Sequence, residues 1–120
     1  NAGLDIEIGD TTTLQTLVTA GANGARVNAI SCISDDVERI VQLYINDGVT
    51  DFLIGSTTIA TLSGTDGITP SVSLLNATDL PFLGEDLSLY LEATFTLKAA
   101  VTVTVTTAKK ISLVAQYGDY

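Results

Sequence analysis

Short runs of alternating apolar and polar residues, separated by turn signals, constrain the fold of this chain more than any other feature. In the clearest case, Asp47 and Gly48 divide the segment from Val37 to Ile54 into two such runs. Gly48 can adopt the positive φ that a hairpin turn needs, and Asp47 tolerates it. A period of two indicates paired strands. The sequence therefore predicts a β-hairpin here, with one face of its first strand formed by Val41, Leu43 and Ile45.

Similar runs follow along most of the chain. Residues 13–19 and 25–34 are separated by Gly21-Ala22-Asn23-Gly24, whose Asn-Gly pair predicts a second hairpin. The strictest alternation is at residues 101–106, where we expect a strand with its valines inward and its threonines outward. Residues 71–77 form either one helical turn or a brief strand. The other β-prone runs are residues 87–92, 94–100 and 111–117, of which 94–100 either pairs with 87–92 or crosses to a second sheet.

About seven to nine short strands with regular turn signals are typical of a β-sandwich or jelly roll. Hydrophobic residues make up 46% of the chain and charged residues only 16%, which is an all-β composition. The 120 residues fit one compact domain. We therefore expect an all-β fold, a single-domain antiparallel β-sandwich that spans residues 13–120 and is jelly-roll-like.

Residues 1–12 have two interpretations. Leu4, Ile6 and Ile8 alternate with acidic residues, so the three apolar side chains share one face. The segment is either the first strand of the sandwich or an extended N-terminal arm that pairs with the sheet edge of a neighbouring subunit. Leu4, Ile6 and Ile8 are therefore candidate interface residues.

The formal net charge is −9, from 14 acidic and 5 basic residues. This charge opposes binding to phosphate backbones and anionic lipid, so we expect neither nucleic acid nor a membrane as a partner. No apolar run approaches the roughly 18 residues of a membrane-spanning helix, and the first residues lack the basic start of a secretion signal. The chain has no methionine, so we expect an upstream segment to have been removed before Asn1.

The chain has no histidine, which removes the usual general base and the commonest transition-metal ligand. Ser/His/Asp triads, zinc sites and Cys/His pairs are excluded in their usual forms. The adjacent acids Asp35-Asp36 and Glu85-Asp86 fall beside turns, and there is no tryptophan to line a sugar cleft. We expect solvated carboxylates there rather than a glycosidase pair. The sequence thus predicts a non-enzymatic protein without a cofactor.

Calcium is the one cation that loop carboxylates could hold. Asp47, Asp51 and Asp66 are the candidate ligands, but the spacing of an EF-hand is absent. We therefore predict no metal site, and a calcium titration of the melting temperature would test weak binding.

Cys32 is the only cysteine, so an internal disulfide is excluded. It is either a small buried hydrophobic residue or the partner of a disulfide to another chain. Tyr117 and Tyr120 are further candidate interface residues near the end of the sequence. Together with Tyr44 and Tyr90 they also raise the alternative of a surface that stacks on sugars.

Several segments resemble small virion structural proteins of tailed bacteriophages. The first is the run from Arg39 to Gly48, continued by Phe52-Leu53-Ile54-Gly55. The later ones are the run from Gly64 to Val72, then Leu74-Leu75 and Leu80-Pro81, and the ending from Val114 to Tyr120. Together they cover most of the chain from Ala25 onward.

Within that class, the closest similarity is to capsid decoration, or cement, proteins. The resemblance implies a β-rich subunit on the capsid exterior of the virion, which clamps neighbouring copies of the major capsid protein. It also implies a homotrimer, in which the N-terminal segment grips the shell. Two alternatives stay open: a tail, neck or fibre component of the virion, and a carbohydrate-binding β-sandwich module.

Overall fold

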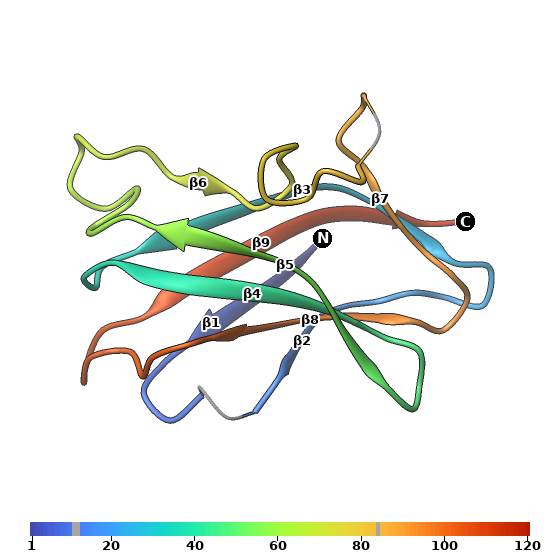
Figure 1. Ribbon diagram of the computed structural model, residues 1–120, viewed down its shortest axis with the longest axis horizontal. Coiled ribbons are helices and arrows are strands. Elements are labelled where there is room, and N and C mark those ends of the chain that lie inside the picture. Colours follow the sequence, from blue (N-terminus) through green and yellow to red (C-terminus); the bar gives the residue numbers. More distant parts are fainter. Residues whose placement is uncertain (11–12, 84) are drawn as a thin grey trace.

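The computed structural model of the protein describes residues 1–10, 13–83 and 85–120. Within these ranges the chain consists of strands and loops and has no helix (Figure 1). The strands found there are β1 (Ala2–Ile6), β2 (Gln15–Thr19), β3 (Ala25–Ser34), β4 (Arg39–Asn46), β5 (Asp51–Ile59), β6 (Val72–Ser73), β7 (Leu89–Leu91), β8 (Thr96–Val101) and β9 (Ile111–Asp119).

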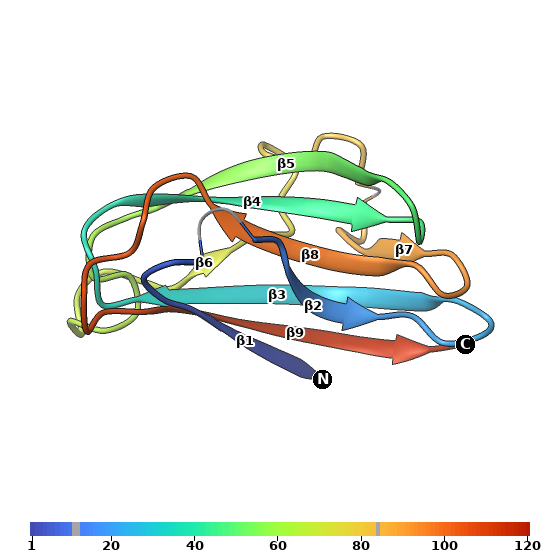
Figure 2. The same ribbon diagram turned by 90° about the horizontal axis from the view of Figure 1, so that it is seen from below.

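Two antiparallel sheets make up the molecule. The five-stranded sheet has the order β1-β9-β3-β6, with β7 also paired with β3, and the four-stranded sheet has the order β2-β8-β4-β5. Figure 2 shows the sheets as two layers, with β4 and β5 in one and β1, β3 and β9 in the other. The expected all-β, single-domain antiparallel β-sandwich is therefore confirmed.

The core lies between the sheets, where alternate side chains of the two layers meet. Val41 and Leu43 point inward from β4, and Cys32 and Leu113 point inward from the five-stranded sheet. Each is at most 2% exposed. Burial of one such side chain contributes about 1.5–3 kcal/mol to stability, so this layer of contacts is what holds the sheets together.

Asp47 and Gly48 form the turn of the β4–β5 hairpin, as the sequence predicts. Gly48 has a φ of 102°. Asp47 Oδ1 accepts hydrogen bonds from the N–H groups of Val49 (2.9 Å) and Thr50 (2.8 Å). The two strands stay paired as far as Ile59, well beyond the predicted end of the second one.

Ala2–Ile6 is the first strand of the sandwich and not a free arm. It lies antiparallel to β9 at the edge of the five-stranded sheet, with Leu4 opposite Leu113. Ile6 is fully buried. The apolar side chains of this segment thus fill the core of their own chain, which is the first of the two interpretations of residues 1–12. Residues 11 and 12 lie outside the described ranges.

The hairpin predicted between residues 13–19 and 25–34 is wrong. The chain does reverse at Gly24, whose φ is 90°. However, β2 belongs to the four-stranded sheet and β3 to the five-stranded sheet. The N–H of Ala20 donates to the carbonyl of Phe95 (2.9 Å), so the end of β2 stays paired with the segment that leads into β8.

The strand predicted for residues 101–106 is also wrong. β8 ends at Val101, and Val103 is 57% exposed. The N–H of Thr106 donates to the carboxylate of Asp36 (2.8 Å), which draws this segment away from the sheet and toward the β3–β4 turn. Residues 102–106 form a loop, in which Val105 is buried and Val103 is exposed.

The structure decides two alternatives that the sequence left open. β8 pairs with β2 and β4, so residues 94–100 lie in a different sheet from β7. Within residues 71–77 the regular element is the brief strand β6.

Candidate functional site

The acidic residues are concentrated in the loops. All of them except Asp5, Asp51 and Asp119 lie outside the strands. The negative charge of the protein therefore surrounds the connections between strands. The outward faces of the two sheets carry little of it, and they are the largest regular surfaces available for contact.

The outward face of the central strands β3 and β9 has no charged side chain from Ala29 to Ile33 and from Ser112 to Gln116, whereas Arg26 and Asp119 lie at the other end of the same two strands. We name it the Val114 face, and its members are Ala29, Ser31, Ile33, Ser112, Val114 and Gln116. The strand register places Ser31 opposite Val114 and Ile33 opposite Ser112. Val114 is 51% exposed and Ile33 is 40% exposed. Because no charge must be dehydrated, such a face can dock on another protein at a low desolvation cost.

Asp5 of β1 borders the Val114 face, and its charge is offset there. Ser112 Oγ donates to Asp5 Oδ1 (2.6 Å), and Lys110 Nζ lies 3.6 Å from Asp5 Oδ2. The hydrogen bond from Ser112 and the positive charge of Lys110 outweigh the opposite effect of burial and lower the pKa of Asp5. Both partners of this ion pair are about half exposed, so the pair adds little stability but neutralises the edge of the face.

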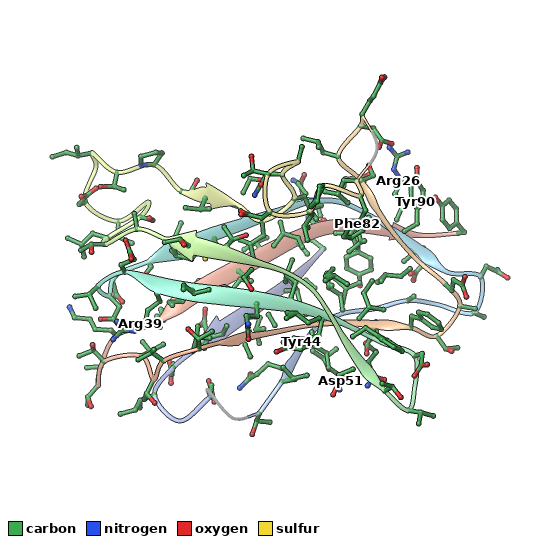
Figure 3. The ribbon with its side chains drawn as sticks, in the orientation of Figure 1. Arg26, Arg39, Tyr44, Asp51, Phe82 and Tyr90 are labelled. Carbon is green, nitrogen blue, oxygen red and sulfur yellow. The ribbon has the colours of Figure 1, made fainter. Side chains whose placement is uncertain are left out.

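The outward face of the four-stranded sheet is different, because an ion pair crosses it. Lys98 Nζ lies 3.9 Å from Asp51 Oδ1. Tyr44 points outward beside this pair, and its hydroxyl donates to Gln42 Oε1 (3.0 Å) (Figure 3). Ile40 of the same strand is 40% exposed, the same fraction as Ile33 on the opposite sheet. Ile40 therefore provides a matched position for comparing the two faces.

A shallow groove of about 250 Å³ lies beside β7, lined by the aromatic rings of Phe82 and Tyr90. Figure 3 shows both residues at the same side of the molecule as Arg26. The Arg26 guanidinium lies 5.7 Å from the centroid of the Tyr90 ring, and its Nη2 donates to Asp86 Oδ2 (2.9 Å). Ser88 Oγ accepts from Arg26 Nε (3.2 Å). Two exposed rings beside polar groups can hold a sugar ring or an apolar side chain.

Three of the four adjacent carboxylates noted in the sequence, Asp35, Asp36 and Asp86, have partners in the fold. Asp36 is buried and accepts hydrogen bonds from the N–H groups of Val37 and Thr106 (both 2.8 Å). Asp35 accepts one from the N–H of Lys110 (2.8 Å). Asp86 is the partner of Arg26 described above. Each of these three carboxylates is thus held by a contact within the fold. The sequence predicts that they are solvated, and for Asp36 this prediction is wrong, because the residue is buried.

Two of the three candidate calcium ligands, Asp47 and Asp66, serve their own turns, whereas Asp51 begins β5, where it pairs with Lys98 and accepts a hydrogen bond from Asn46 Nδ2 (2.7 Å). Hydrogen bonds from the N–H groups of Thr50 and Val49 lower the pKa of Asp47. Those from Thr69 and Ile68 lower the pKa of Asp66 in the same way. In the ranges that the structure describes, no group of three or more His, Cys, Asp or Glu side chains is placed to hold a metal ion.

The candidate interface residues from the sequence do not form one surface. Ile6 and Cys32 are fully buried in the core, which argues against a role in contacts with another chain. Burial also raises the pKa of the Cys32 thiol to about 12, so an intermolecular disulfide is not favoured. Leu4 and Tyr117 are partly buried and pack on the core. The two exposed candidates, Ile8 and Tyr120, lie near opposite ends of β9. Ile8 lines a hollow together with Lys109 and Lys110, which precede the strand, and Tyr120 follows the end of the strand.

The sequence analysis does not single out the Val114 face. It also does not single out Val49 and Ile68, two apolar residues that are exposed in turns. A signal for the face was present in the run at residues 111–117, because the positions that alternate with its apolar side, Ser112, Val114 and Gln116, are all uncharged. A signal for the turns was the tetrapeptide Asp-Gly-(Val/Ile)-Thr, which occurs at residues 47–50 and again at residues 66–69.

The described ranges do not include a helix with the length and apolarity needed to cross a membrane. No family model, no curated protein and no solved structure matches the chain.

Proposed function

We propose that the protein is a non-enzymatic structural protein of a tailed-phage virion, which decorates the outside of the capsid by binding the major capsid protein. The observation that carries this proposal is the uncharged Val114 face on a protein whose net charge is −9. The sequence resemblance described above, centred on the hairpin at Asp47-Gly48, supports the same class of protein.

A strongly acidic protein can contact a large partner most easily through a surface without charge. Burial of the acidic loops would remove their carboxylates from water, whereas burial of the uncharged Val114 face removes no charged group. β3 and β9 pair from Ser34–Ile111 to Ala25–Asp119, so the backbone beneath this face is held by a long ladder of hydrogen bonds. A rigid face of this kind loses little conformational entropy on docking, as a static contact in a shell requires.

The test is binding to expanded capsids that lack the protein. Val114→Glu places a charge on the proposed contact face, and Ile40→Glu places the same charge on an outward position of the other sheet. We expect wild type and Ile40→Glu to bind the capsids and Val114→Glu to bind at least about tenfold more weakly. Wild-type protein that stays in the supernatant would refute the proposal, and equal binding by both variants would refute the role of the Val114 face.

The resemblance also leads us to propose a homotrimer on the virion surface. Sedimentation equilibrium of the purified protein measures this directly, and a monomer at all concentrations would contradict it. A map of the particle that places the protein in the tail, neck or fibres would favour the alternative within the same class.

A second candidate function is carbohydrate binding, which the groove beside β7 favours. Phe82 and Tyr90 are 58% and 56% exposed, and Arg26 supplies donors beside them. A glycan array would detect this activity. Binding that Tyr90→Ala abolishes and Tyr44→Ala leaves intact would support it over the structural role of the groove.

A further inference from the structure

Two turns of this fold share nearly the same tetrapeptide. Asp-Gly-Val-Thr occupies residues 47–50, between β4 and β5, and Asp-Gly-Ile-Thr occupies residues 66–69, in the loop after β5. In the first turn, Asp47 Oδ1 accepts from the N–H groups two and three residues later, at 2.9 and 2.8 Å. In the second, Asp66 Oδ1 accepts from the corresponding N–H groups at 2.9 and 2.6 Å. The turns are therefore a matched pair, in which the effect of a single differing contact can be isolated.

An aspartate followed by glycine can rearrange its own backbone, because glycine has no side chain to obstruct the reaction. The glycine nitrogen attacks Cγ of the protonated aspartate carboxyl, an N–Cγ bond forms, and the amide proton and the carboxyl hydroxyl leave together as water. The product is a succinimide ring, which water then opens at either carbonyl. Opening at the carbonyl attached to Cα leaves the chain running through the aspartate side chain, as isoaspartate. Water is the only other reactant, and the net mass is unchanged.

The attacking nitrogens of the two turns differ in one contact. Gly48 N–H donates to Asn46 Oδ1 at 2.7 Å. The position equivalent to Asn46 in the second turn is Thr65, whose hydroxyl instead donates to the carbonyl of Ser34 (2.8 Å). In the part of the chain that the structure describes, Gly67 N–H has no acceptor. The nitrogen of Gly67 is thus available for attack, whereas that of Gly48 must first leave its acceptor.

The other conditions for the reaction are largely shared by the two turns. Their glycines have φ values of 102° and 76°, and nothing lies within 4 Å of a Cβ added to either. Backbone hydrogen bonds lower the pKa of both Asp47 and Asp66, which reduces the protonated fraction in both turns. Asp66 Oδ2 also accepts from Thr69 Oγ1 (3.0 Å), a bond between exposed groups that water can replace. The N–H of the glycine is therefore the contact that separates the turns.

The Asn-Gly pair at residues 23–24 is held more firmly than either turn. Gly24 N–H donates to the carbonyl of Gly21 (3.2 Å), and the Gly24 carbonyl accepts from the N–H of Tyr120 (3.1 Å). A Cβ added to Gly24 would lie 2.7 Å from the carbonyl oxygen of Leu91, so β7 encloses this backbone. Attack on the preceding asparagine would require movement of a nitrogen that the surrounding strands fix in place.

We propose that Asp66 is the position at which this protein spontaneously forms isoaspartate. Asn46 protects the equivalent Asp47 by holding the nitrogen that would attack it. The product has an additional carbon in its backbone, so the turn at residues 66–69 loses the hydrogen bonds that its aspartate accepts. The inference concerns the chemistry of the chain itself and does not depend on the proposed function.

Long incubation of the native protein at about pH 5 tests the inference, because more carboxyl is protonated there than at neutral pH. Peptide mapping separates the aspartate and isoaspartate forms of each turn, and enzymatic methylation of isoaspartate confirms the assignment. We expect Asp66 to convert about fivefold faster than Asp47, the factor that corresponds to one hydrogen bond. Equal rates at the two positions, or isoaspartate that forms first at residue 47 or 23, would overturn the inference.

Two variants exchange the contact between the turns. Asn46→Ala removes the acceptor of Gly48 N–H and should raise the rate at Asp47 about fivefold, to that of Asp66. Thr65→Asn supplies an acceptor in the second turn and should slow Asp66 by the same factor. The unchanged turn in each variant is the internal control, because general loosening of the fold would accelerate both. An unchanged rate at Asp47 in Asn46→Ala would refute the protective role of Asn46.

Discussion

Replacing Asp36 with alanine is expected to destabilise the fold by about 3–5 kcal/mol, the range for loss of one partner of a buried charge pair. The carboxylate is 2% exposed and accepts hydrogen bonds from the N–H groups of Val37 and Thr106, both at 2.8 Å. Arg39 Nη2 lies 3.4 Å from its Oδ2. Each hydrogen bond to a charged group contributes about 1.5–3 kcal/mol, which gives a loss of the same size. Total stabilities of about 5–15 kcal/mol make such a loss easy to measure.

Urea unfolding, with the free energy extrapolated to zero denaturant, is the assay. Glu38→Ala is the control, because it removes an exposed carboxylate from the same loop. We expect the control to stay within about 0.5 kcal/mol of the wild type. If Asp36→Ala unfolds at the same urea concentration as Glu38→Ala, the reasoning from the buried contacts is refuted.

The same contacts predict a dependence on pH. Burial alone would raise the pKa of Asp36, but the hydrogen bonds from Thr106 and Val37 and the charge of Arg39 hold this pKa below its usual value. The stabilisation is therefore complete above the unfolded-state pKa of about 4 and is lost as the pH falls through the lower folded-state pKa. The difference in stability between wild type and Asp36→Asn should shrink below about pH 4. A difference that stays constant to strongly acidic pH would contradict this assignment.

Three further changes test other parts of the fold. Gly55→Ala should lower the free energy of unfolding by about 1–3 kcal/mol in urea titrations, because the added Cβ overlaps the Leu80 side chain; an unchanged midpoint would count against this packing. Cys32 should react with a thiol reagent in mildly alkaline buffer only after unfolding, because it is fully buried and its pKa is raised to about 12; rapid labelling of native protein would disprove the burial. Gly48→Ala should cost about 1 kcal/mol through its φ of 102°, whereas Gly118→Ala, with equally open space and no positive φ, should melt close to the wild type.

Features that depend on neighbours in the sequence could be predicted. The β4–β5 hairpin follows from Asp47 and Gly48, because the carboxylate and the positive φ act within the turn itself. The inner face of β4 follows from simple alternation. The predicted hairpin before β3 failed for the opposite reason: a turn signal reports that the chain reverses, but not which strand the reversed chain will pair with. β2 pairs instead with β8, from Gln15–Ala99 to Thr19–Thr96, a strand far along the sequence.

The candidate site was predicted less well than the fold. Alternation separates Cys32 from Ile33 and assigns them to opposite faces, but it does not say which face meets the second sheet. In the structure Cys32 points into the core and Ile33 points outward, so the proposed contact surface contains the residue that the sequence did not single out. The same ambiguity applied to Ile6, whose apolar face could equally have met another subunit; the structure buries it in the core of its own chain. Which side of a strand is inner is a property of the whole sandwich.

The acidity of the protein has a structural origin that also explains the uncharged Val114 face. Several aspartates accept hydrogen bonds from backbone N–H groups in turns or between loops, namely Asp10, Asp35, Asp36, Asp47, Asp66, Asp86 and Asp119. The short side chain of aspartate suits this local bonding, which is why the residue is favoured in turns. A sandwich with many connections therefore accumulates negative charge in its loops as a consequence of how those loops are closed. The strands need no such groups, so the Val114 face is free to remain neutral, and contact with a partner becomes easiest there rather than at the loops beside it.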